Sequence, residues 1–444
     1  IPGGPAQAGW TMYPPLSEII PTNGQVYLLV GFVLLITSSL LGAVNFIATI
    51  IQLRAPGMTW FRLPFFVWAQ FVTAFLLLLA FPPLEAAAVM MLVDILAPGA
   101  SFFSPTGLMV AGAPADISGG GSPLLYQHLF WFLGHPEVYV LILPAIGFVT
   151  EILANNTRRP IWGYKLMVGS VLVLGFLSFI VWAHHMYMTG MSNKVATFFQ
   201  TTTMIISIPS VILLTCLFMS LWRGSIRFNT ASMFALAFLP MFGIGGLTGL
   251  PLGFNFTDIH LHDTYYVIAH FHYVVAPGTV FGLLAGIYYW YPKMTGRKMN
   301  EFWGKTHFWC SLIFMNLIFM PMFAQGMDGM IRRMSDGGAA YSAADGIVGL
   351  TATSLALNQN ISHAAWALGL SQIPFIINFF WSMLHGEKVK DDNTWKSTTL
   401  EWQTPTPPPH GNFIKTPEVF RDAYEYSVPG ADKDYSPQNE PVKS

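Results

Sequence analysis

Charged residues are scarce in this chain, and neither sign is in excess. Asp, Glu, Lys and Arg make up 10% of its 444 residues, whereas soluble domains usually contain about 25%. Hydrophobic residues reach 53%, and the mean hydropathy is +0.51. This composition excludes an ordinary soluble domain and predicts an integral membrane protein of helical type. The formal net charge of -1 argues against a nucleic-acid partner.

Cysteine is nearly absent. The two cysteines, Cys216 and Cys310, lie inside apolar runs, which excludes a disulfide framework and a thiolate metal cluster. Any metal bound here must therefore use nitrogen or oxygen ligands. No basic segment followed by an apolar run opens the chain, so we expect no targeting segment there.

Long apolar runs dominate the sequence. Nine of them are long enough to cross a membrane as helices, at roughly 25–52, 61–95, 125–152, 163–190, 196–222, 231–254, 264–292, 304–326 and 347–384. We predict an all-α, polytopic transmembrane helix bundle over residues 1–385 and a polar tail at 386–444. We expect Phe81-Pro82-Pro83 to kink or briefly break the second helix. We expect the connection 97–124 to be irregular and the tail to be packed on a surface or disordered.

Basic residues fall mostly on alternate connections between these segments. Thirteen lie on one set of connections, and only Lys194, Arg332 and Arg333 lie on the other. Because positively charged connections usually stay in the cytoplasm, this bias predicts the orientation of the chain. The cytoplasmic parts would be 53–61, 153–162, 223–230, 293–303 and the tail.

Polar groups concentrate in one apolar run that begins near His262. Ionisable residues at membrane depth are costly and usually mark a functional site. His270 and His272 are two residues apart, so they leave a helix in directions about 200° apart. They cannot bind one metal ion and instead favour two cofactors on opposite sides of the helix. The alternative is a pair of histidines that pack against neighbouring helices.

Histidines on three predicted helices lie at a similar depth. His135, the adjacent His184 and His185, and His270 are each roughly 10–15 Å below the predicted outer surface. Neutral imidazole suits copper, iron and zinc, so a polynuclear site, or a heme beside a second metal, is the economical explanation. The alternative is unrelated packing histidines that coincide in depth.

Two polar residues follow His135 on its helix. Tyr139 comes four residues later and shares a face with the imidazole. Glu137 projects about 200° away from that face, and a carboxyl in hydrocarbon should hold a proton that it can relay. The alternatives are an ordinary buried phenol and a carboxyl that hydrogen-bonds a backbone carbonyl at the Pro136 kink.

The predicted outer side carries two more candidate sites. The guanidinium groups of Arg332 and Arg333 could hold heme propionates, although a solvated charge pair explains them equally well. His262 and Asp263 offer nitrogen and oxygen donors to a divalent ion. Capping of the following helix by Asp263 is the alternative.

Three motifs resemble a known family. They are Trp131–Tyr139, Trp182–Tyr187, and His262–Tyr266 continued by His270-Phe271-His272. Over residues 9–385 the chain resembles the catalytic subunit I of heme-copper terminal oxidases, of the cytochrome c oxidase type. The connection 97–124 and the segment Gln200–Pro209 are similar to a bacterial alternative branch.

The resemblance implies a binuclear copper and heme centre. His135, His184 and His185 would bind the copper ion. Tyr139 would be bonded covalently to His135 and would supply an electron and a proton when dioxygen is cleaved. Glu137 would be the branch-point carboxyl of the proton path.

The resemblance also implies two hemes, which we expect to be heme A. His270 would be the proximal ligand of the high-spin heme and His272 an axial ligand of the low-spin heme, with Phe271 between the two. Arg332 and Arg333 would bind their propionates.

Three further groups follow from the same resemblance. His262 and Asp263 would form a magnesium or manganese site above the hemes. Trp10 and Trp131 would line the heme environment. Subunits II and III, dioxygen and cytochrome c or quinol would be the partners, in a bacterial inner membrane.

Two features depart from the family pattern. The second histidine of the low-spin heme and the aspartate of the usual proton channel belong to N-terminal helices that this chain lacks, so we expect a truncated or split subunit. Leu213 replaces the channel lysine, and leucine cannot carry a proton. We expect Thr and Ser side chains with water, or the Glu137 route, to supply those protons.

The predicted function is a proton-translocating terminal oxidase that reduces dioxygen to water with electrons from cytochrome c. A quinol oxidase shares these motifs. A proton-coupled transporter without redox cofactors would also use buried histidines and a carboxyl, and a non-functional fragment is a further alternative.

Overall fold

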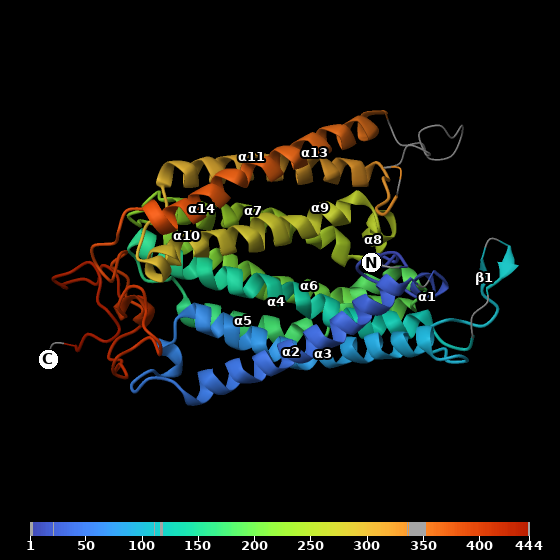
Figure 1. Cartoon of the computed structure of the whole chain (residues 1–444), viewed down its shortest axis with the longest axis horizontal. Helices are drawn as coiled ribbons and strands as arrows, with labels where there is room; N and C mark the ends of the chain where they lie inside the picture. Colours follow the sequence, from blue (N-terminus) through green and yellow to red (C-terminus); the bar gives the residue numbers. More distant parts are fainter. Residues whose placement is uncertain are drawn as a thin grey trace. The chain divides into compact units, whose positions relative to one another are not determined.

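A computed structural model describes residues 3–20, 22–110, 112–115, 119–334, 336 and 352–442. Helices make up most of these residues, as predicted (Figure 1). Nine helical spans of the described chain are long and apolar enough to cross a membrane, which confirms the predicted number. The spans are Asn23–Gln52, Phe65–Leu96, Pro123–Thr157, Tyr164–Thr189, Asn193–Leu221, Thr230–Gly253, Tyr265–Thr295, Glu301–Met327 and Ser354–His385. Residues 347–351 of the last predicted segment lie outside the described residues.

The chain divides into two compact units. The first comprises Ile1–Gln52, Phe71–Val140 and Gly175–Ile205, and the second comprises Leu53–Gln70, Leu141–Leu174 and Ile206–Ser444. Four of the long helices, α3 to α6, pass from one unit into the other.

The first unit packs around an aromatic and aliphatic core. Its elements are α1 (Leu16–Ile19), α2 (Asn23–Gln52) and parts of α3 (Phe65–Leu96), α4 (Pro123–Thr157) and α6 (Asn193–Leu221), with a 3-10 segment η2 (Trp182–Thr189). Met12, Phe103 and Tyr126 are among its fully buried side chains. The segment before α2 is therefore part of this core.

The second unit contains the helix that carries His270 and His272. α9 (Tyr265–Val274) continues through a π-helical turn, η3 (Val275–Val280), into α10 (Phe281–Thr295). It packs beside α7 (Thr230–Gly253) and α11 (Glu301–Met327), and α8 (Asn255–Leu261) precedes it. A Cβ added to Gly326 would lie 2.0 Å from the Tyr266 nitrogen. Glycine therefore lets α11 approach the start of α9 closely.

The polar tail packs on the second unit through residue 442. It contains a short 3-10 helix, η4 (Leu400–Gln403), whose Trp402 is fully buried. Arg158 at the end of α4 donates 2.7 Å hydrogen bonds to the carbonyls of Trp395 and Lys396. The Tyr424 hydroxyl donates to the buried Glu151 carboxylate at 2.6 Å. Of the two expectations for the tail, packing on a surface is the one that the structure shows.

The remaining elements are η1 (Trp60–Arg62), α5 (Tyr164–Ser178), α13 (Ala352–Ser371) and α14 (Ile373–His385).

Three sequence-based expectations are corrected. The helix α3 is continuous through Pro82 and Pro83, so a break at these prolines is wrong, whereas a kink stays a prediction. A helix in an apolar layer keeps its remaining backbone hydrogen bonds. The connection 97–124 contains a short antiparallel hairpin, β1 (Met109–Val110) and β2 (Ala113–Pro114). The end of the fourth span is not α-helical but is the 3-10 segment η2.

Candidate metal centre

The first unit brings three predicted imidazoles together. One ring nitrogen from each of His135, His184 and His185 lies within 4.8 Å of the other two. Nδ1 of His135 is 3.4 Å from Nε2 of His185, and Nε2 of His184 is 3.1 Å from that same atom. The adjacent His184 and His185 both lie in the 3-10 segment η2, and their ring nitrogens approach the same point.

Neighbouring side chains hold the rings in this arrangement. Trp131 stacks on His185 with ring centroids 4.0 Å apart and planes at 13°, and its indole nitrogen donates to the Tyr13 hydroxyl. The Thr203 hydroxyl lies 2.9 Å from Nδ1 of His184. A bond at Nδ1 directs the other ring nitrogen, Nε2, toward a ligand. Trp10 is half exposed and meets Trp131 edge to face at 5.9 Å.

The cluster fits a copper ion. Its donors are three imidazole nitrogens, which suit copper among the first-row metals. Nε2 of His135 is buried and has no hydrogen-bond partner in the described structure. The Tyr139 ring lies beside this imidazole, with centroids 4.9 Å apart. An orphaned ring nitrogen beside a phenol is consistent with a bond between the two side chains. Glu137, on the same helix, is half-buried.

In the second unit, His270 faces α7. Its Nδ1 lies 2.9 Å from the Gly245 carbonyl, with the Thr248 hydroxyl at 3.4 Å. A Cβ on Gly249 would lie 2.6 Å from Cε1 of His270. The ring is therefore held by a backbone acceptor in a space that only glycine provides, with Nε2 as the remaining ligand atom.

His272 faces α11 instead. Its Nδ1 lies 2.8 Å from the Ile268 carbonyl, and its ring stacks on Phe319 with centroids 4.4 Å apart. The two histidines thus contact different helices, which confirms that they project to opposite sides of α9.

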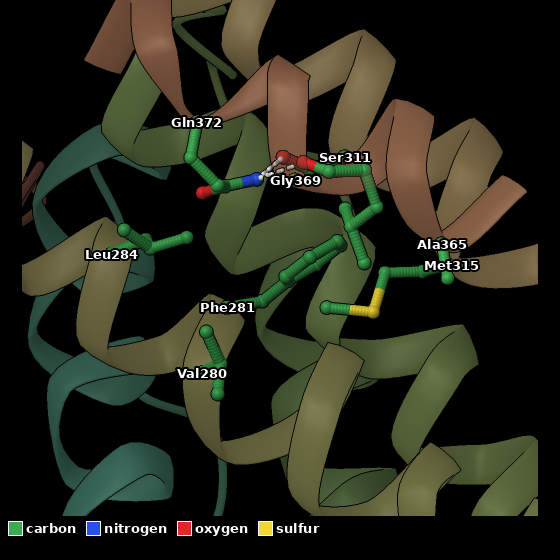
Figure 2. A pocket seen from close by; sticks show the side chains of 9 residues that line it. Val280, Phe281, Leu284, Ser311, Met315, Ala365, Gly369 and Gln372 are labelled. Atoms are coloured by element: carbon green, nitrogen blue, oxygen red, sulfur yellow. Dashed lines mark hydrogen bonds between the residues drawn. The ribbon is translucent and has the colours of Figure 1, made fainter. Parts of the chain in front are cut away.

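A cavity of about 330 Å³ lies between α10, α11 and α13 in the second unit (Figure 2). Met315, which precedes Phe319 by one turn, lines it together with Val280 and Phe281. Most of its wall is apolar, and the Gln372 amide donates to the Ser311 hydroxyl at 3.3 Å at one end. The cavity can take a hydrocarbon group.

The residues around the start of α9 form a polar cluster. The Arg332 amide donates to the Asp263 carbonyl at 2.8 Å, and its guanidinium lies 3.8 Å from the Asp263 carboxylate and 5.7 Å from the Phe271 ring centre. Nδ1 of His262 is 3.3 Å from Asp258, and Nε2 is 3.7 Å from Asp263. Arg333 is exposed. Thr264, rather than Asp263, caps α9 through its side chain, so the capping alternative for Asp263 is wrong.

Sequence reasoning missed several residues of these sites. Asp258 precedes His262 by four residues, a spacing that places both on one face of a helix and could have revealed it. Thr203, Gly249 and Phe319 carry no signal in the sequence, because their roles depend on which helices lie side by side. The buried Glu151 was detectable as an ionisable residue within an apolar run.

Comparisons with known proteins agree with this geometry. The family described as Cytochrome C and Quinol oxidase polypeptide I matches residues 1–358. The alternative cytochrome c oxidase subunit 1 of Bradyrhizobium diazoefficiens is 45% identical over 99% of this chain and 74% of its own length. The cytochrome c oxidase subunit 1 of Synechocystis is 42% identical over 96% of this chain and 72% of its own length.

A solved structure supports the fold. A chain of a heme-copper terminal oxidase dimer superposes with a TM-score of 0.66 at 20% identity, over 86% of this chain and 66% of its own length. The family match over residues 1–358 and the relatives at 45% and 42% identity show that the chain belongs to the cytochrome c and quinol oxidase polypeptide I family, as a membrane-embedded oxidoreductase subunit of the cytochrome c oxidase subunit I type.

Proposed function

We propose that this chain is the catalytic subunit of a respiratory oxidase that reduces dioxygen to water with electrons from cytochrome c and couples the reaction to proton translocation. The observation that carries the proposal is the convergence of three imidazoles in the first unit. The opposed histidines of α9 support it. A transporter needs neither arrangement.

The copper ligands are His135, His184 and His185. Copper and heme iron, when bound, supply dioxygen binding and electron transfer. The protein residues orient that chemistry: Thr203 sets the direction of His184, and Trp131 supports the ring of His185. Buried, preorganised ligands avoid reorganisation during turnover.

The heme ligands are His270 on the α7 side and His272 on the α11 side. Each Nδ1 lies close to a backbone carbonyl, and Phe271 stands between the two positions. The apolar cavity beside Met315 can receive a hydrocarbon substituent of the heme at His272.

Protons move through two side chains of α4. The Tyr139 hydroxyl holds a proton beside His135 and can release it together with an electron. The Glu137 carboxyl holds a second proton within the membrane-spanning helix. Leu213 stands where the family's channel lysine would be, so either Thr and Ser side chains with water or the Glu137 route supply those protons.

Polar residues before α9 complete the centre. Arg332 and Arg333 pair with propionates. His262 and Asp263, with Asp258 beside them, hold magnesium or manganese through hard donors. Trp10 and Trp131 border the heme environment.

Because basic residues are concentrated on the connections of one side, the tail faces the bacterial cytoplasm. Subunits II and III complete the complex.

The test uses the complex purified from its native membrane. We expect a heme absorption spectrum with high-spin and low-spin components, one copper ion per binuclear centre and oxygen consumption driven by reduced cytochrome c. Quinol as the only effective donor would replace the cytochrome c assignment. A preparation without heme or copper would contradict the oxidase proposal.

A further inference from the structure

A buried carboxyl in the first unit has no part in the proposed mechanism. Glu18 in α1 is 8% exposed. One of its carboxyl oxygens, Oε2, accepts a hydrogen bond from the Ser104 hydroxyl. The other, Oε1, is buried and finds no donor among the described residues. The Asp94 carboxyl of α3 is its close acidic neighbour.

Asp94 cannot supply the missing donor, because backbone groups already hold it as an acceptor. Both of its oxygens accept from the Phe102 amide, at 2.8 and 2.9 Å, and one also accepts from the Phe103 amide at 3.0 Å. Two ionised carboxylates in contact would repel each other, so the proton of the pair belongs on Glu18.

A second buried oxygen without a partner lies near the Asp94 turn of α3. Gln25 is 1% exposed, and its Oε1 has no partner in the described structure. Its amide lies 3.7 Å from the Met91 sulfur, and Met91 precedes Asp94 by one turn of α3.

The segment that carries Glu18 is connected to the histidine cluster. Tyr13, five residues earlier, accepts the hydrogen bond of Trp131, whose ring stacks on His185. A change of charge at the histidines can therefore reach this segment through one hydrogen bond and one stacked pair.

We propose that Glu18 and Asp94 form an acid pair that binds one proton and releases it to the outer aqueous phase during turnover. The release part rests on the proposed function and on the predicted orientation. The O–H bond of Glu18 breaks, the proton passes to water, and the pair takes up another proton before the next release. No electron or further reactant is involved.

The electrostatic surroundings support a proton that exchanges at neutral pH. Burial raises the pKa of Glu18 from 4.5 to about 7; the Ser104 hydrogen bond opposes this rise, and Asp94 adds to it. The Tyr126 phenol also faces Glu18, and the Tyr13 ring lies edge to face against Tyr126. A phenol carries no positive charge, so neither side chain stabilises the ionised form of the Glu18 carboxyl as a cation would.

The first experiment is a pH titration of the purified, resting complex by infrared difference spectroscopy. We expect a protonated-carboxyl band that disappears with a midpoint near pH 7 and is absent in Glu18→Gln. In Asp94→Asn the midpoint should fall by about one pH unit. Glu85→Gln, which removes another carboxyl of α3, should keep the band. Absence of such a band from the unsubstituted complex would overturn the proposal, as would its persistence in Glu18→Gln.

The second experiment follows proton release from the complex in vesicles. Glu18→Gln should keep uncoupled oxygen consumption and slow outward proton release at least severalfold, whereas Glu85→Gln should not slow it. An unchanged rate of outward proton release in Glu18→Gln would overturn the proposal that Glu18 releases its proton during turnover. Loss of the band on adding calcium or magnesium would show a cation site in place of the acid pair. Because the infrared titration needs no turnover, failure of the oxidase assignment leaves the acid pair separately testable.

Discussion

Replacement of Gly249 by alanine should weaken heme binding at His270 without disturbing the histidine cluster of the first unit. The new Cβ would lie 2.6 Å from Cε1 and 3.3 Å from Nε2 of the His270 ring. Carbon atoms pack best at about 3.5–4.0 Å, so the ring must move by about 1 Å. That movement would break its 2.9 Å contact with the Gly245 carbonyl.

The cost can be assessed from these contacts. Overpacking by one methyl group costs about 1–3 kcal/mol, and loss of the hydrogen bond about 0.5–1.5 kcal/mol. Their sum is about 1.5–4.5 kcal/mol, which corresponds to a loss of heme affinity of roughly 10- to 1,600-fold. Alanine is otherwise favoured over glycine inside a helix, so the backbone does not add to the loss.

The measurement is heme and copper content of the purified complex, together with the spectrum of the high-spin heme. Gly246→Ala is the matched control, because it lies on the same helix and its Cβ would meet nothing within 4 Å. We expect the control to retain both hemes and Gly249→Ala to lose the high-spin one while keeping copper. Full high-spin heme in Gly249→Ala would refute the assignment of His270.

Four further outcomes are expected. Thr203→Val removes the hydroxyl 2.9 Å from His184 and should lower copper affinity about 10- to 100-fold, measured as copper per heme; Thr203→Ser should restore it. Tyr139→Phe should retain copper and lose at least 100-fold in oxygen reduction, and an active variant would contradict the role of the phenol. Glu137→Gln should lose most turnover and proton translocation in vesicles, and full retention would show that another route carries the protons. Because burial raises the pKa of Glu18 from 4.5 to about 7, the folded state holds a proton that the unfolded state has released. Stability should therefore fall, by at most about 3 kcal/mol, as pH rises between these values, and thermal unfolding of Glu18→Gln should lose this pH dependence.

Much of the architecture was predictable from one sequence. Nine apolar runs became nine candidate spans because a membrane helix requires a long, uninterrupted apolar stretch. The opposite directions of His270 and His272 followed from helical geometry alone. Expectations from local sequence failed at two places. The helix α3 continues through Pro82 and Pro83, where a break was one expectation, and the end of the fourth span is the 3-10 segment η2, where an α-helix was expected.

The sequence by itself determined the class of protein, the number of spans and the histidines that could bind metals, because hydropathy and helical periodicity are properties of neighbouring residues. Only the tertiary structure decided what surrounds each histidine. Thr203 on His184, Gly249 beneath His270 and Phe319 on His272 each come from a different helix than the ring they contact. Such contacts depend on how helices pack against one another, and no local pattern in the chain encodes that packing.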